Sequence, residues 1–285
     1  FRTYSTSPIR RREARRWATR AAPVEHKQSP MPELPNPSAF PSSFVGAPYP
    51  ERPPLVARDG WLIVALFVFP TLFAVVVAVG LRDTAARWPL LIIALTLVAL
   101  TAWAIWFFRD PNRKPAAGED LSRAMICPAD GVVVKIDTAS PPPEALGAVN
   151  ESPVQLTRMC IFMNVFNVHV NRAPLAGTVE AIAYNRGKFF NASFDKASDL
   201  NERASLILKL PEGKRLFVIQ IAGLVARRIV CKVTPGKVLQ AGERYGLIKF
   251  GSRVDVYLPA GYEPAVALRT KVLAGQTIIA RRPGA

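Results

Sequence analysis

Two long apolar stretches dominate the first half of the chain. They cover residues 61–81 (WLIVALFVFPTLFAVVVAVGL) and 89–108 (PLLIIALTLVALTAWAIWFF), and neither contains a charged residue. A helix over either stretch would be roughly 30 Å long, which matches the hydrocarbon thickness of a bilayer. Buried core helices are the alternative, but helices that are apolar all round need far more protein to cover them. The pattern therefore predicts a transmembrane helical hairpin over residues 58–110.

Beyond residue 108 the pattern changes to short runs rich in β-branched residues, separated by Gly, Pro and Asn. Long helical periodicity is absent there, and the segment Pro211-Glu212-Gly213-Lys214 reads as the turn of a hairpin. We expect a mainly β domain over 111–285, a compact antiparallel sandwich or barrel-like fold. The runs are GVVVKI, MCIFMNVFNVHV, GTVEAIAY, SLILKL, RLFVIQIA, RRIVCKV, GLIKF, VDVYL and QTIIA.

Residues 1–57 differ from both segments. They are rich in Pro and Arg and show no sustained apolar periodicity, which predicts a disordered tail. Because the sequence starts at Phe1, we expect residues 1–30 to be upstream translation or a processed fragment. An organelle transit peptide is the alternative, and Glu13 and Glu25 argue against it.

The chain is strongly basic, with a formal net charge of +16, so an anionic partner is expected. From Arg109 onward there are 25 Lys and Arg against 15 Asp and Glu. A domain tethered beside lipid headgroups would use this surplus to dock on anionic lipid, and no nucleic-acid-binding module is recognisable. More positive charges flank the hairpin than lie in its connection, which predicts that both ends are cytoplasmic, at the inner membrane. The flanking charges are Arg52, Arg58, Arg109, Arg113, Lys114 and Arg123, against Arg82 and Arg87.

The three cysteines, Cys127, Cys160 and Cys231, are widely spaced and form no CxxC pattern. No disulfide framework or metal site is indicated, and reduced, buried thiols are the expected state.

Three residues carry candidate chemistry. His169 is the one imidazole outside the tail, Asp130 lies in a Pro-Ala-Asp-Gly turn before a strand, and Ser252 follows Gly251 inside a strand-like pattern. Each has a simpler interpretation: an exposed histidine on a polar strand face, a turn-forming aspartate, and a Gly-Ser bulge. Together they are the residue types of an activated nucleophile, although the sequence does not show that they meet.

A competing interpretation rests on Asp195-Lys196-Ala197, which matches the tripeptide that carries lipoate in lipoyl domains. It makes the protein a membrane-anchored lipoyl- or biotinyl-like carrier modified at Lys196. The long polar stretch around this lysine argues against it, because carrier lysines lie at tight hairpin tips. A third interpretation is a non-enzymatic lipid-binding β domain on an anchor.

Five motifs, in order, resemble those of the phosphatidylserine decarboxylases in their short prokaryotic branch. The resemblance runs from about residue 109 to 280, and a hydrophobic hairpin before the domain is also usual in that family. The motifs are CPADGVVVKI, IFMNVFNVHVNRAPLAGTVEAI, GKFFNASFDKASDLNERA, QIAGLVARRIVC and ERYGLIKFGSRVDVYLP.

The resemblance implies a pyruvoyl enzyme that cuts itself between Gly251 and Ser252. A covalent pyruvoyl group, formed from Ser252, would then be the cofactor on the small α chain 252–285. The remainder would form the large β chain, and the two would stay together as a heterodimer. By motif, His169 is the base that takes the Ser252 proton, and Asp130 orients His169.

In turnover, the resemblance implies a Schiff base between the amine of phosphatidylserine and the pyruvoyl group, loss of CO₂, and release of phosphatidylethanolamine. Some relatives of the long branch carry a second histidine three residues before the catalytic one, where this chain has Phe166. The proton donor is therefore expected to be His169 or a water that it holds. Acyl-chain preference and oligomeric state, a homo-oligomer included, are left open.

Overall fold

The two apolar stretches form the helices α2 (Trp61–Gly80) and α3 (Arg87–Phe107), preceded by the short η2 (Arg58–Gly60). This confirms the predicted helical hairpin, and both helices are long and apolar enough to cross a membrane. The predicted tail lies outside the described residues, apart from the buried Val56 and Ala57. The computed structural model describes residues 56–115, 117–190, 200–224, 228–249 and 251–283.

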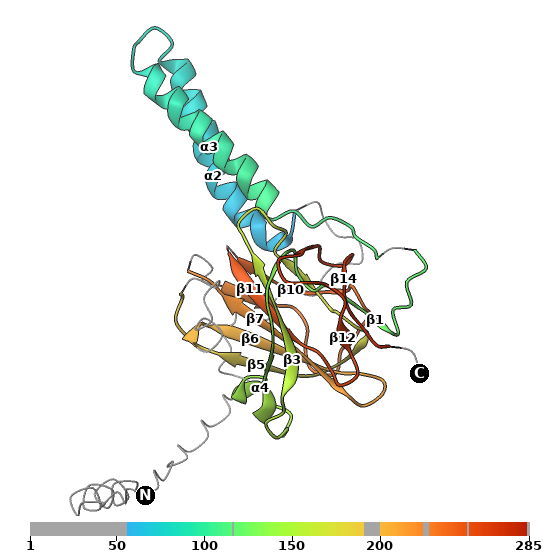
Figure 1. Ribbon diagram of the computed structural model, residues 1–285. Coiled ribbons are helices and arrows are strands. Elements are labelled where there is room, and N and C mark those ends of the chain that lie inside the picture. The colour runs from blue at the N-terminus through green and yellow to red at the C-terminus, as the bar shows by residue number, and fades with distance from the viewer. Residues whose placement is uncertain (1–55, 116, 191–199, 225–227, 250, 284–285) are drawn as a thin grey trace, which may run out of the picture. The chain divides into compact units, whose positions relative to one another are not determined.

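Past the hairpin, the described chain is mainly antiparallel β, with the one short helix α4 (Pro143–Gly147) (Figure 1). The expected mainly β class is confirmed, in the form of a strongly curled sheet that closes about half a barrel. Its main sheet has the order β13-β2-β3-β11-β7-β6-β5-β9. These strands are β13 (Lys271–Val272), β2 (Gly131–Ala139), β3 (Leu156–Met163), β11 (Ser252–Tyr257), β7 (Arg215–Ala222), β6 (Arg203–Lys209), β5 (Gly177–Asn185) and β9 (Val238–Leu239).

Two three-stranded sheets complete the domain, with the orders β4-β10-β8 and β1-β14-β12. The predicted hairpin is confirmed, since Lys209 of β6 pairs with Arg215 of β7 across the turn. The remaining strands are β4 (Val170–Arg172), β10 (Arg244–Lys249), β8 (Arg228–Cys231), β1 (Ala124–Ile126), β14 (Ile278–Arg281) and β12 (Glu263–Pro264).

Alternation along the strands divides the apolar residues between two clusters. On β6, Leu206 and Leu208 belong to the main core, whereas Ile207 faces a second cluster under α4. On β11, Val254 and Val256 belong to the main core. Because side chains alternate along a strand, Ser252 lies on the same inner face as these valines.

The end of the hairpin is packed against the sheet β4-β10-β8. Phe107 and Phe108 form a buried cluster with Val230 of β8 and Leu247 of β10. A main-chain hydrogen bond links the two ends of the hairpin, because Ala57 N–H donates to Phe108 O at 2.7 Å. The hairpin therefore ends directly beside β10, the strand that leads to Gly251 and Ser252.

Candidate active site

His169 lies in the interior, in the connection between β3 and β4. Its side chain is 2% exposed and its ring stacks on Phe107, with ring centroids 4.2 Å apart. The simpler interpretation of an exposed histidine is therefore wrong. The expected strand also breaks here, because β3 ends at Met163 and a turn precedes β4.

Both ring nitrogens of His169 have partners. Nδ1 lies 2.9 Å from the carbonyl oxygen of Asn167, and Gly251 N–H donates to Nε2 at an N···N distance of 3.3 Å. A carbonyl only accepts, so Nδ1 carries the proton and Nε2 presents its lone pair. The structure thus places the basic nitrogen of His169 at Gly251, one residue from Ser252.

Burial keeps this imidazole neutral. The pKa of His169 is lowered to about 4, mainly by removal from water; Arg109 also lowers it, whereas the Asn167 carbonyl and the charge of Asp130 act in the opposite direction. At neutral pH the ring is therefore a free base.

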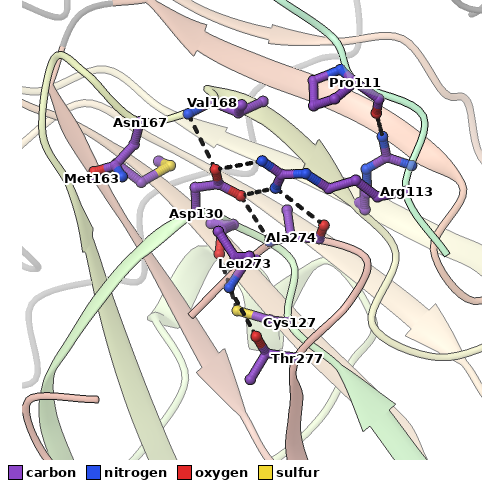
Figure 2. Close-up of polar contacts among 12 residues, drawn as sticks. Pro111, Arg113, Cys127, Asp130, Met163, Asn167, Val168, Leu273, Ala274 and Thr277 are labelled. Atoms are coloured by element: carbon purple, nitrogen blue, oxygen red, sulfur yellow. Dashed lines mark hydrogen bonds and ion pairs between the residues drawn. The ribbon is translucent and has the colours of Figure 1, made fainter. Parts of the chain in front are cut away.

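Asp130 is buried at the start of β2, where three donors surround its carboxylate (Figure 2). The Arg113 guanidinium pairs with both oxygens, with 3.0 Å from Nη2 to Oδ2. Ala274 N–H donates to Oδ1 at 2.8 Å, and Val168 N–H donates to Oδ2 at 3.4 Å. The simpler interpretation, in which the carboxylate binds the backbone of its own turn, is wrong, because these partners are distant in the sequence.

Among the described residues, Asp130 makes no hydrogen bond with the ring of His169. The acceptor at Nδ1 is the main chain of Asn167, and Asp130 instead holds the neighbouring residue Val168 by its N–H. Asp130 is thus placed to orient His169 through the backbone.

Gly251 and Ser252 mark a change of sheet, since β10 and β11 belong to different sheets. Gly251 has φ +59°, in the left-handed region that favours glycine, and no heavy atom lies within 4 Å of a Cβ built there. The interruption is therefore no bulge within one strand, but a turn where the chain crosses between sheets.

Ser252 is fully buried as the first residue of β11, the strand between β3 and β7. Its Oγ lies 4.0 Å from the sulfur of Met163, a weak hydrogen-bonding contact. Two buried amides lie beyond it: Gln220 Nε2 donates to Asn171 Oδ1 at 2.8 Å, and Asn171 Nδ2 lies 3.9 Å from the same sulfur. The inner face around Ser252 is thus lined by polar groups within an otherwise apolar core.

Sequence reasoning missed three members of this site. Arg113 counted only as a flanking charge of the hairpin, Phe107 only as part of an apolar run, and the Asn167 carbonyl could not be recognised. No local signal separates them from their neighbours.

No group of three or more His, Cys, Asp or Glu in the described part of the chain could hold a metal ion. The three cysteines are free and buried, as expected.

A family model described as phosphatidylserine decarboxylase matches residues 100–280. The chain belongs to the phosphatidylserine decarboxylase family.

Several bacterial members of the phosphatidylserine decarboxylase family are similar over most of their length, and each is called a phosphatidylserine decarboxylase proenzyme. The protein of Ruegeria pomeroyi is 55% identical over 64% of this chain and 80% of its own. The proteins of Solidesulfovibrio magneticus and Magnetococcus marinus are each 46% identical, over 80% and 82% of this chain and 96% and 98% of their own.

The resemblance to the short prokaryotic branch is thereby confirmed. Family membership gives no support to the carrier interpretation, and Lys196 lies outside the described residues.

Proposed function

We propose that this protein decarboxylates phosphatidylserine to phosphatidylethanolamine after cutting its own chain between Gly251 and Ser252. The observation that carries the proposal is the neutral Nε2 of buried His169 at the main chain of Gly251, the residue before the buried Ser252. The name proenzyme, shared by the relatives, fits a chain that matures by cleavage.

The cleavage uses groups of this chain alone. Ser252 Oγ gives its proton to His169 and attacks the Gly251 carbonyl. The peptide C–N bond then breaks as His169 passes this proton to the Ser252 nitrogen, and an ester forms between Gly251 and Ser252 Oγ. Removal of the Ser252 Cα proton then breaks the Cβ–O bond, leaving a Gly251 carboxylate and a dehydroalanine at position 252. Water converts this dehydroalanine to a pyruvoyl group, and ammonia leaves.

The residues around Ser252 fit this chemistry. Gly251 has a left-handed conformation that strains residues with a side chain but not glycine. The space where its Cβ would lie is open, which leaves room for the main chain of Gly251 to move. When formed, the pyruvoyl group supplies a ketone that condenses with an amine and withdraws electrons as CO₂ leaves. In this chain the proton would come from His169 or from a water that it holds, since Phe166 is no donor.

The two products of cleavage would stay together. Residues 252–257 of β11 pair with both β3 and β7, from Ser252↔Met163 and Ser252↔Ala222 to Tyr257↔Arg158 and Tyr257↔Phe217. A central strand held by hydrogen bonds on both sides cannot leave without opening the core. The small chain 252–285 therefore keeps position 252 inside the domain.

The membrane hairpin brings the domain to its lipid substrate. We propose that both hairpin ends lie on the cytoplasmic face of the inner membrane, since the flanks are more basic than the connection between the helices. Phosphatidylserine then meets the site at a high effective concentration.

The test is to purify the full chain in lipid nanodiscs and to follow both its mass and CO₂ release from carboxyl-labelled phosphatidylserine. We expect two chains, with masses that correspond to residues 1–251 and 252–285, and release of CO₂. Ser252→Ala should stay at the full 31.2 kDa and be inactive, and His169→Ala should block cleavage. A full-length chain that releases CO₂ at the normal rate would refute the proposal, and added lipoyl or biotinyl mass would instead identify a carrier.

A further inference from the structure

The connections of the main sheet share one end with Ser252. Strand pairing aligns Asn185, Arg203, Ile221, Arg253 and Phe162 in a single row across β5, β6, β7, β11 and β3. Ser252, Met163 and Ala222 form the next row outward. The chain segments that follow β3, β5 and β7 and precede β6 therefore all leave the sheet at the end that holds Ser252.

Exposed apolar side chains gather at this end. Outside the hairpin, seven large hydrophobic side chains are exposed among the described residues. Five of them lie at the Ser252 end of the sheet: four just beyond the Ser252 row, and one after Val272, which pairs with Gly131 at the same end. Such a gathering indicates a surface that contacts something apolar. We call these five the apolar rim: Phe166, Phe190, Leu200, Leu224 and Leu273.

Basic side chains accompany the apolar rim. Arg186, Lys188 and Arg228 are exposed on the same connections or at their ends. The acidic residue described there, Glu202, is only partly exposed and is hydrogen-bonded to Tyr184. Apolar tips flanked by cations are typical of a surface that dips into a bilayer with anionic headgroups.

The hairpin ends beside the apolar rim. Arg109, which follows α3, donates from Nη2 to the carbonyl of Phe166 at 2.9 Å, and its guanidinium lies 4.1 Å from the ring centre of Trp106. Tryptophan and arginine at the end of a membrane helix mark the level of the headgroups. A hairpin that crosses the bilayer thus brings lipid to the side of the domain where Phe166 is exposed.

We infer that the apolar rim inserts into the interfacial layer of an anionic bilayer and holds the Ser252 end of the sheet against the lipid. The occupant is the bilayer, because the hairpin ends at Arg109, which binds the Phe166 carbonyl, and so brings lipid to this side of the domain. The inference shares with the proposed function the assumption that the hairpin is in the membrane. It does not require cleavage or decarboxylation.

The test places an environment-sensitive fluorophore on single cysteines introduced at the apolar rim. Phe166→Cys, Phe190→Cys and Leu224→Cys would each be made in a full-length Ser252→Ala chain, in vesicles containing phosphatidylglycerol. The native cysteines are buried, and the unsubstituted chain measures any labelling of them. We expect the emission of the rim probes to be blue-shifted. Lipid-borne quenchers should lower its intensity by about half or more, and iodide in the water should lower it little, as for side chains in the headgroup region.

Val238→Cys is the matched control. Val238 is 60% exposed, against 63% for Phe166, and pairs with Thr178 at the opposite end of β5. At 3.3 Å per residue, that end is about 20 Å from Asn185. The probe at Val238→Cys should be quenched by iodide and not by the lipid-borne quenchers. If the rim probes behave like the Val238 probe, the inference is wrong, whereas a failure of decarboxylation would leave the depth profile unchanged.

Discussion

Phe107, the last residue of α3, stacks on His169 with 30° between the ring planes. One face of the imidazole is thus covered by the end of the helical hairpin, which contributes to the burial that lowers the pKa of His169. The hairpin therefore forms part of the candidate site. The position of the hairpin and the environment of His169 are therefore structurally linked.

Replacing Phe107 should slow self-cleavage. Phe107→Leu keeps an apolar side chain but removes the ring that stacks on His169. An aromatic stack contributes about 0.5–1.5 kcal/mol, so its loss should lower the cleavage rate about two- to tenfold. The rate would be followed on denaturing gels after cell-free synthesis into nanodiscs. Trp106→Leu changes the neighbouring, exposed ring and should cleave normally. Equal cleavage rates in Phe107→Leu and Trp106→Leu would show that the stack of Phe107 on His169 does not affect cleavage.

Replacing Arg113 should destabilise the domain and impair cleavage. Arg113→Met leaves the buried carboxylate of Asp130 without its ion-pair partner, at a cost of about 3 kcal/mol. The apparent melting temperature would be measured in the Ser252→Ala background, and the cleavage rate in the native one.

Two further variants separate position from charge at this site. Lys114→Met removes an exposed neighbouring cation and should leave both quantities unchanged. Arg113→Met combined with Asp130→Asn removes the unpaired charge, so stability should partly return while cleavage stays slow. Cleavage at the normal rate in the double variant would show that this pair does not position His169.

Gly251→Ala should also slow cleavage. An alanine at φ +59° costs about 1 kcal/mol or more, and relief of this strain would change the orientation of the Gly251 carbonyl that Ser252 attacks. Gly213 offers a matched control, because it has φ +81° and equally open space in a distant turn. Gly213→Ala should lose similar stability but cleave normally. If both variants cleave at the native rate, the left-handed conformation is not needed.

Cleavage should persist at mildly acidic pH. His169 must be neutral to accept the Ser252 proton, and its pKa is lowered to about 4, so the rate should be constant from neutral pH downward and fall by half near pH 4. An ordinary histidine would give the half-point near its usual pKa of about 6.5. Freshly synthesised precursor transferred to buffers of different pH would give this profile. A half-point near 6.5 would show that the ring is hydrated when it acts.

Much of the architecture could be predicted from local pattern. The uncharged apolar runs predict both helices to within two residues of their observed ends, α2 (Trp61–Gly80) and α3 (Arg87–Phe107), because membrane helices are defined by length and composition. Alternating β-branched runs likewise predict most strands. The candidates His169 and Ser252 followed from residue type and motif.

The surroundings of those candidates depended on the tertiary structure. Arg113 meets Asp130 across 17 residues and Gly251 meets His169 across 82. Such contacts depend on strand register and on which face of each strand is buried, and no short window of sequence contains this information. By itself, the sequence determined the hairpin, the β character and the residues able to react. The fold decided that a main-chain carbonyl holds the imidazole, that Asp130 pairs with Arg113 and accepts the N–H of Val168, and that Phe107 at the end of α3 covers the ring of His169, because each depends on packing between distant segments.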